Sequence, residues 1–217
     1  MWRPSESRTS ARFPAAGELG YRQRALGAGD PTAPACSVSR RATPVPTSWA
    51  FSTRPREIEL RAEEFNAYLE EDGIPDILEA RRRSNEVAQG ARERYSKHVK
   101  AVFQVGAPRS EDFNVVLGYP AEIVLLENPY AIGRDAPLRV RCLVDGRPVA
   151  NQMVLWGGEQ RGRTLARRGT RTGADGVAEL TLDAAGRWYV KFVHMVRATE
   201  RGLDYESKWA AVTFETR

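Results

Sequence analysis

Short runs of alternating apolar and polar residues, separated by turn signals, follow one another from Pro120 to the end of this 217-residue chain. In the run PLRVRCLV the apolar side chains share one parity: Leu138, Val140, Cys142 and Val144. Apolar residues at every second position are typical of a strand that has one face on a core. Asp145-Gly146 follows directly, and this pair favours the tight turn of a β-hairpin. The repeated pattern constrains the fold more than any other feature of the sequence.

About six or seven such runs lie in the last hundred residues, with no helical pattern between them. We therefore predict that residues 111–217 form an antiparallel β-sandwich domain with an immunoglobulin-like number of strands. The Cys…Trp…Cys spacing of a true immunoglobulin domain is absent, so the likeness concerns architecture alone. We expect a turn at Gly157-Gly158 and a polar edge strand over residues 164–172. Trp188 and Trp209 are predicted to serve packing, because indole rings bury a large area.

The preceding residues, 51–110, mix helical and strand patterns, and we predict a helical and strand connecting segment there. Apolar side chains with helical spacing occur within residues 61–72: Phe65, Tyr68 and Leu69. Gly73 suits the end of that helix, and Pro75 suits the first turn of a second short helix. Residues 94–106 are dense in β-branched and aromatic side chains, which favours a strand. His98 falls on the polar parity of this strand, so we expect an exposed imidazole without a role.

The first fifty residues differ from the rest in charge. They hold seven Arg, no Lys and three acidic residues, so they carry +4 of the formal +5, while the other 167 residues carry +1. We predict that residues 1–50 are a disordered or artefactual leader, because they lack apolar periodicity. A nucleic-acid binder is expected to carry its basic surface on a folded face, so we predict no nucleic-acid partner.

Targeting signals are not recognisable in this sequence. Arg, Pro and Glu interrupt every apolar stretch of the leader, so it does not read as an export signal as written. The chain also has no run of about 18 apolar residues, and we predict no membrane span.

Catalytic motifs are absent as well: the sequence has no G-x-S-x-G elbow, H-E-x-x-H helix, P-loop or C-x-x-C pair. We therefore predict a protein that is not an enzyme, with no catalytic and no cofactor-binding residues. Cys142 shares the parity of a core row and is expected to be a small core residue. The other cysteine, Cys36, lies in the leader, so we predict no disulfide.

One histidine stands at a position where a ligand could bind. His194 ends an inward-facing row: Trp188, Val190, Phe192 and His194. Row ends lie at the rim of a sandwich, and Asp204 and Glu206 follow in the loop before the last strand. An imidazole with one or two carboxylates can hold a divalent metal, so His194, Asp204 and Glu206 are the candidate metal ligands. The alternative is a rim histidine that is hydrogen-bonded to a carboxylate.

An ordered set of segments gives the sequence a family resemblance. The segments are EEFNAYLEEDGIPDILEARR, RERYSKHVKAVFQVG, LGYPAEIVLLENPY, VRCLVDGRPVANQMVLW, TRTGADGVAEL, AGRWYVKFVHM and ESKWAAVTFE. Over residues 51–217 they resemble the NikM-like extracytoplasmic family associated with nickel or cobalt uptake. The segment from DGRPVANQMV to AGRWYVKF also resembles the prealbumin-like or carboxypeptidase-regulatory-like β-sandwich.

The resemblance implies a periplasmic or extracytoplasmic protein that binds or helps deliver nickel or cobalt, with an envelope transport partner. From the sequence as written, we expect that the signal peptide and amino-terminal domain of that family are missing and that the leader stands in their place. An alternative is a cell-envelope β-sandwich module that binds another protein without metal. Without the missing domain, Phe65, Tyr68 and Phe103 would lose a packing surface, so we also expect self-association through exposed apolar surface.

Overall fold

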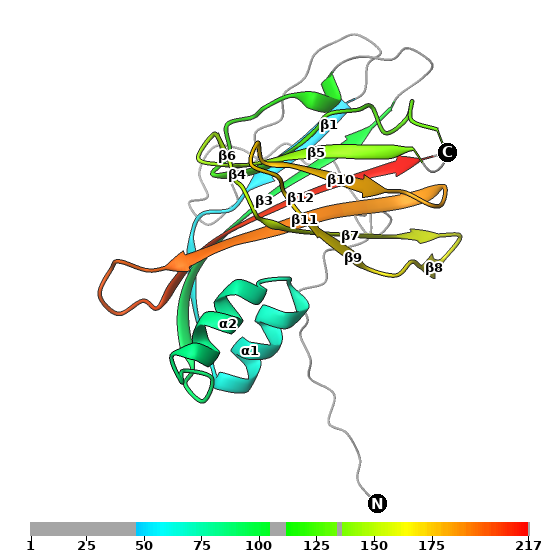
Figure 1. Cartoon of the computed structure of the whole chain (residues 1–217). Coiled ribbons are helices and arrows are strands. Elements are labelled where there is room, and N and C mark those ends of the chain that lie inside the picture. Colours follow the sequence, from blue (N-terminus) through cyan, green and yellow to red (C-terminus); the bar gives the residue numbers. More distant parts are fainter. Residues whose placement is uncertain (1–46, 105–111, 134–135, 217) are drawn as a thin grey trace, which may run out of the picture. The chain divides into compact units, whose positions relative to one another are not determined.

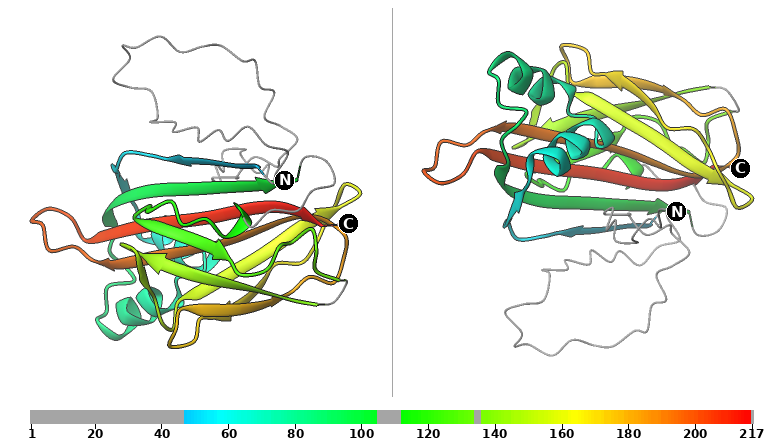
Figure 2. Two further views of the ribbon diagram at one scale, coloured as in Figure 1. Left: turned by 90° about the horizontal axis from the view of Figure 1, so that it is seen from above. Right: turned by 90° about the horizontal axis from the view of Figure 1, so that it is seen from below.

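Residues 47–104, 112–133 and 136–216 are described by a computed structural model. They form two sheets packed face to face and a pair of helices on the far side of the larger sheet (Figures 1 and 2). The mainly β sandwich predicted from the sequence is confirmed. Within the described residues, no helix is long and apolar enough to cross a membrane.

The larger sheet has eight strands. Its main path runs through β1 (Thr47–Ser52), β3 (Ala91–Phe103), β12 (Tyr205–Thr216), β11 (Gly186–Arg197), β7 (Met153–Gln160) and β8 (Arg163–Thr164). Two further strands pair beside this path, β2 (Arg56–Leu60) with β3 and β9 (Arg168–Arg171) with β7. β12 pairs with β3 in parallel, whereas the other strand pairs in the described residues are antiparallel.

The smaller sheet covers part of one face of the larger sheet. It contains β10 (Val177–Thr181), β5 (Pro137–Val144), β4 (Ala121–Leu125) and β6 (Arg147–Pro148), and a short 3-10 helix, η1 (Asp112–Asn114), precedes β4. Leu138, Val140 and Cys142 are 0% exposed in the core between the sheets, as their parity predicts. The Asp145-Gly146 turn after β5 has the two positive φ angles, 50° and 74°, that this residue pair favours.

The helices α1 (Ala62–Glu71) and α2 (Pro75–Arg83) cover the outer face of the larger sheet. Phe65 stacks on Tyr205 with ring centroids 5.2 Å apart, and Tyr68 stacks on Trp209 at 5.6 Å. Gly73 joins the helices with φ +73°, and a side chain there would meet Leu155 at 2.7 Å. The predicted helices, their glycine break and the proline start are therefore confirmed.

A buried carboxylate ties the helices to the sheet. Glu93 is 2% exposed, and its Oε1 accepts hydrogen bonds from the hydroxyls of Tyr68, at 3.0 Å, and Ser207. Burial raises the pKa of Glu93. The Trp209 indole N–H in turn donates to Ser207 Oγ, so one polar chain links α1, β3 and β12.

The segment predicted over residues 51–110 contributes a strand to the larger sheet. Within it, β3 pairs with β12 along nine positions from Tyr205 to Thr213. β1 begins at Thr47 and also pairs with β3. Of the predicted leader, only residues 47–50 are among those described.

Two glycines expected to form a turn lie inside a strand instead. Gly157 and Gly158 belong to β7 and pair with Tyr189 and Trp188 of β11. A side chain at Gly158 would lie 2.4 Å from the Arg187 carbonyl oxygen, and one at Gly157 would meet the Tyr189 hydroxyl at 2.8 Å. These glycines permit the close approach of β11, which local turn propensity does not reveal.

The face of β3 that packs inside the sandwich is the polar one, contrary to the sequence prediction. Ser96, His98 and Lys100 are 8%, 3% and 4% exposed, whereas Tyr95 and Val99 on the other parity are only half-buried. The expectation of an exposed His98 was therefore wrong. Polar side chains can occupy this buried row because each of them finds a hydrogen-bond partner.

The strongest of these partnerships is a buried ion pair between β3 and β4. Lys100 Nζ lies 2.8 Å from Glu122 Oε1, with side-chain exposures of 5% and 2%. Glu122 also accepts backbone N–H bonds from Leu117 and Gly118, and Lys100 donates to the Val115 carbonyl. Burial lowers the pKa of Lys100, and the bond to Glu122 opposes that shift. The pair thereby holds the segment before β4 against β3.

We expect Glu122→Gln to lower the free energy of unfolding by about 3–5 kcal/mol, because it leaves a buried ammonium without its counter-ion. Urea unfolding at neutral pH measures the change. The control is Glu127→Gln, which removes the charge from a more exposed pair with Arg139 and is expected to cost less than about 1 kcal/mol. Equal losses in the two variants would contradict the structural role given to the buried pair.

Candidate functional site

The end of the sandwich where the smaller sheet stops carries a group of polar side chains on the inner face of the larger sheet. We call it the polar end cluster; its members are His98 on β3, His194 on β11, Lys208 on β12, Asp145 in the turn after β5, and Gln152 before β7. Beyond the cluster, the hairpin of β11 and β12 extends past the smaller sheet (Figure 1). The cluster therefore lies where the inner face of the larger sheet becomes accessible.

His194 is half-buried, and its hydrogen bond fixes the state of its ring. Its Nδ1 lies 3.1 Å from Oε1 of Gln152, while the Gln152 amide nitrogen donates to the carbonyls of Met153 and Val193. Because the amide oxygen can only accept, Nδ1 of His194 carries the proton and donates. The other ring nitrogen, Nε2, is then an unprotonated lone pair, and it has no hydrogen-bond partner within the described residues. The ring is thus set as a neutral Nε2 ligand.

An ion pair lies between the two imidazoles of the chain. Lys208 is the cross-strand neighbour of His194, and its Nζ lies 2.5 and 2.7 Å from the two carboxylate oxygens of Asp145. Burial lowers the pKa of His194, the charge of Lys208 lowers it further, and Asp145 opposes both. The pKa of His98 is lowered by burial and by Lys208, while Asp145 and Glu122 oppose the shift. Both rings are therefore neutral at pH 7.

The His98 ring is held between two serine hydroxyls. Ser52 Oγ lies 2.8 Å from Nδ1, and Ser96 Oγ lies 3.1 Å from Nε2. A serine beside a histidine can act as a nucleophile, so this is the nearest approach to a nucleophile–base pair that the described residues contain. The ring is only 3% exposed, and no carboxylate bonds to it in the described part of the chain. The arrangement satisfies a buried imidazole and does not build an active site.

The three predicted metal ligands do not converge. Asp204 lies in the hairpin beyond the β12 pairing, where its backbone carbonyl accepts from Ala198 and its carboxylate accepts from the Arg92 backbone N–H. Ala198 is four residues after His194, which is about 13 Å along a strand. Glu206 shares the face of His194, but it pairs across from Val196 and lies 3.6 Å from Arg94. His194 therefore remains a candidate ligand, but Asp204 lies too far along the hairpin to share a metal ion with it.

Within the described ranges, no three His, Cys, Asp or Glu side chains gather in a group that could hold a metal ion. Cys142 is free and 0% exposed, as predicted, and burial raises the pKa of its thiol. Cys36 lies outside the described residues, so the prediction of no disulfide stays a prediction. Trp188 and Trp209 are both buried, which confirms their packing role.

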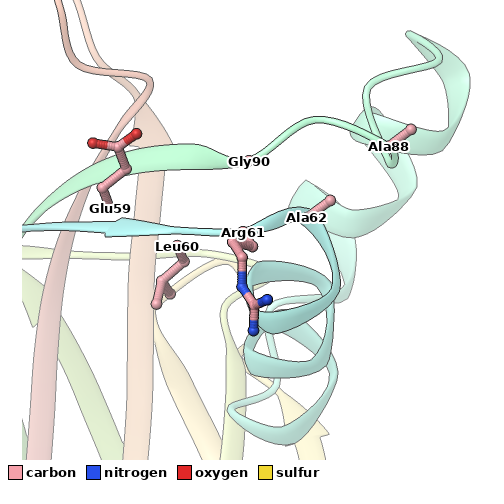
Figure 3. Close-up of a pocket in the computed structure, with 6 residues that line it drawn as sticks. All are labelled: Glu59, Leu60, Arg61, Ala62, Ala88 and Gly90. Carbon is pink, nitrogen blue, oxygen red and sulfur yellow. The ribbon is translucent and has the colours of Figure 1, made fainter.

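A hollow of about 550 Å³ lies where β2 meets α1 (Figure 3). It is lined by Glu59, Leu60, Arg61, Ala62, Ala88 and Gly90. In Figure 3 the Arg61 side chain lies along the start of α1, and its guanidinium forms a 2.7 Å ion pair with Glu64 in the capping box. The lining offers no imidazole, thiol or aromatic ring, so this hollow is a weaker candidate than the polar end cluster.

Sequence analysis missed four of the five residues in the cluster. Asp145 was assigned only to its turn, and Lys208, Gln152 and His98 were not singled out as site residues. Lys208 had no local signal, because β11 ends at Arg197 and β12 begins at Tyr205, and a connection of that length does not fix the register of the two strands. Nothing in the local sequence indicated that Asp145, a turn residue of the other sheet, would pair with Lys208.

Comparison with known proteins gives one match. The family model described as a domain of unknown function, DUF4198, matches residues 23–196. The match includes residues 23–50, more than half of the segment that we predicted to be a leader. No curated protein and no solved structure matches this chain.

The lowered pKa values of His98 and His194 predict how stability depends on pH. Both folded-state pKa values lie below the unfolded value of about 6.5, so the unfolded chain binds more protons as the solution is acidified. We expect the free energy of unfolding to be fully retained above about pH 6.5 and to fall as the pH drops below it. The raised pKa of Glu93 acts in the opposite direction.

Urea unfolding at about pH 7.5 and about pH 5 isolates the histidine contribution. The loss between the two pH values should be smaller in His98→Gln than in the unsubstituted chain, and smaller still when His194→Gln is added. Glu93 is unchanged in all three proteins, so its contribution cancels in the comparison. An identical pH dependence in all three proteins would show that protonation of the two imidazoles does not lower the free energy of unfolding.

Proposed function

Since the chain belongs to the DUF4198 family, whose description names no activity, we propose a function from the geometry of the polar end cluster. The proposal is a non-enzymatic protein that binds a divalent transition metal of the nickel or cobalt class through His194. The resemblance to NikM-like proteins supports this metal class and an extracytoplasmic location. The ring state of His194 is the observation that carries the proposal.

Metal-binding histidines commonly donate one ring N–H to an oxygen acceptor, which orients the ring and leaves the other nitrogen for the metal. The Nδ1–H of His194 has such an acceptor in Gln152 Oε1, 3.1 Å away. Burial keeps the ring neutral at pH 7, as a metal ligand must be. Imidazole nitrogen suits Ni²⁺, Cu²⁺, Zn²⁺ and Co²⁺ better than it suits Ca²⁺ or Mg²⁺.

Asp145 is the carboxylate that we propose as the second ligand, in place of Asp204. Its carboxylate bonds to Lys208, the cross-strand neighbour of His194, whereas Asp204 lies in the hairpin beyond the β12 pairing. Lys208 now holds Asp145, and its ammonium occupies a cation position beside the imidazole. A metal ion would take over that carboxylate from Lys208, and water would complete the coordination sphere.

Isothermal titration calorimetry of the full chain with Ni²⁺, Co²⁺, Cu²⁺ and Zn²⁺ tests the proposal. We expect binding to be lost in His194→Ala and weakened about 10–100-fold in Gln152→Leu, which removes the acceptor that orients the ring. His98→Gln is the matched control and should bind as the unsubstituted chain does, because both nitrogens of that ring already have partners. Unchanged binding in His194→Ala would remove the site, and no binding by the full chain would remove the function.

A second function, a metal-free envelope module that binds another protein, is favoured by one observation. The edge strand β1 exposes Trp49 and Phe51, at 41% and 42%. The edge predicted over residues 164–172 is less suitable, because Arg171 of β9 is paired with Asp76 and Arg168 with Asp183. A stoichiometric partner that is recovered from envelope extract with chelator present, and lost in Phe51→Lys, would support this function.

A further inference from the structure

The apolar surface of this protein lies at a different place from the one predicted. Phe65 is 0% exposed against Tyr205, and Tyr68 stacks on Trp209, so the helices do not expose an apolar patch. Among the exposed large hydrophobic residues of the described part, the two aromatic ones are Trp49 and Phe51 on β1. They pair with Ala101 and Val99 of β3, so all four side chains lie on the outer face of the larger sheet.

The edge that carries these residues changes character along its length. β1 and β2 follow one another along the same side of β3, and β1 is at the end of the sheet order in the described residues. β2 carries Arg56, Glu57 and Glu59, and charges of this kind protect an edge strand from further pairing. Residues 47–53, TSWAFST, have no charge at all. One half of the edge is protected by charge and the other half is not.

We propose that β1 pairs with β1 of a second copy of this chain, in antiparallel orientation about a two-fold axis near Ala50. In that register Trp49 of one copy lies across from Phe51 of the partner subunit, on the same face of the joined sheets. Aromatic cross-strand pairs of this kind stabilise antiparallel strands. The antiparallel direction also carries the charged β2 strands of the two copies away from each other.

A second copy fits this edge better than a charged partner does. A two-fold contact brings the same edge of both copies together, so a charged edge would place like charges next to each other. Residues 47–53 contain no charged side chain, so this repulsion does not arise. The contact is small, because a standard interface buries about 800 Å² on each partner and β1 has six residues. We therefore expect a reversible dimer with a dissociation constant in the micromolar range. This inference does not depend on metal binding, since β1 contributes no residue to the proposed metal site.

Sedimentation velocity of the full chain, from about one to several hundred micromolar, tests the proposal. We expect a concentration-dependent dimer whose dissociation constant rises about tenfold or more in Phe51→Lys, because the substitution removes both aromatic cross-strand pairs and adds two like charges on the same face, one on each side of the axis. The matched control is Val196→Lys, which adds the same charge to a side chain with 43% exposure in the β11–β12 hairpin. Circular dichroism checks that both variants fold.

A cross-link provides a second measurement that does not depend on adding charge. Residues directly opposite each other on antiparallel strands have Cα atoms about 4.5–5.5 Å apart, which suits a disulfide. In a Cys36→Ala background, Ala50→Cys should give a covalent dimer on mild oxidation, and Val196→Cys should not. A monomer at every concentration, a dimer that persists in Phe51→Lys, or no cross-link through position 50 would each overturn the proposal.

Discussion

Burial of both faces of the larger sheet is the constraint on which the rest of this structure depends. A strand with one covered face needs one apolar row, but β3, β11 and β12 are covered by the smaller sheet on one side and by the helices on the other. On β12, Val212 and Phe214 enter the sandwich, while Tyr205 and Trp209 meet the helices. A polar residue in the covered part of these strands is therefore buried on either face, and it needs a partner.

That requirement explains the polar groups inside the molecule. Lys100 and Glu122 form an ion pair between β3 and β4. Glu93 accepts hydrogen bonds from two hydroxyl groups between β3 and the helices. The same logic produces the polar end cluster. There Lys208 pairs with the carboxylate of Asp145, in the turn that follows β5. The protonated Nδ1 of His194 donates to the side-chain oxygen of Gln152. The Nε2 of His194, which has no hydrogen-bond partner within the described residues, distinguishes the cluster chemically from the Lys100–Glu122 pair and from Glu93, whose polar groups are hydrogen-bonded.

Two parts of the larger sheet thus differ in the interactions that they offer. In the polar end cluster, His194 is the cross-strand neighbour of Lys208, whose ammonium pairs with Asp145, and its Nε2 is the atom that we propose as a metal ligand. At β1, uncharged backbone and two exposed aromatic rings form a surface suited to another strand. The two proposals, a metal site at His194 and a contact between two copies at β1, therefore concern separate parts of one sheet.

Local pattern alone determined much of the fold. The alternation in β5, the Asp145-Gly146 turn, both helices and the Gly73 break were predictable because each depends on residues adjacent in sequence. The buried parity of β3, the place of Gly157 and Gly158 inside β7, and the parallel β3–β12 pair were decided only by the tertiary structure, because they depend on which distant strand packs where. The candidate site divides in the same way. His194 could be found as the end of an inward row, but its neighbours Asp145, Lys208 and Gln152 come from other strands and turns, and their approach is set by the register of the sheets and not by spacing along the chain.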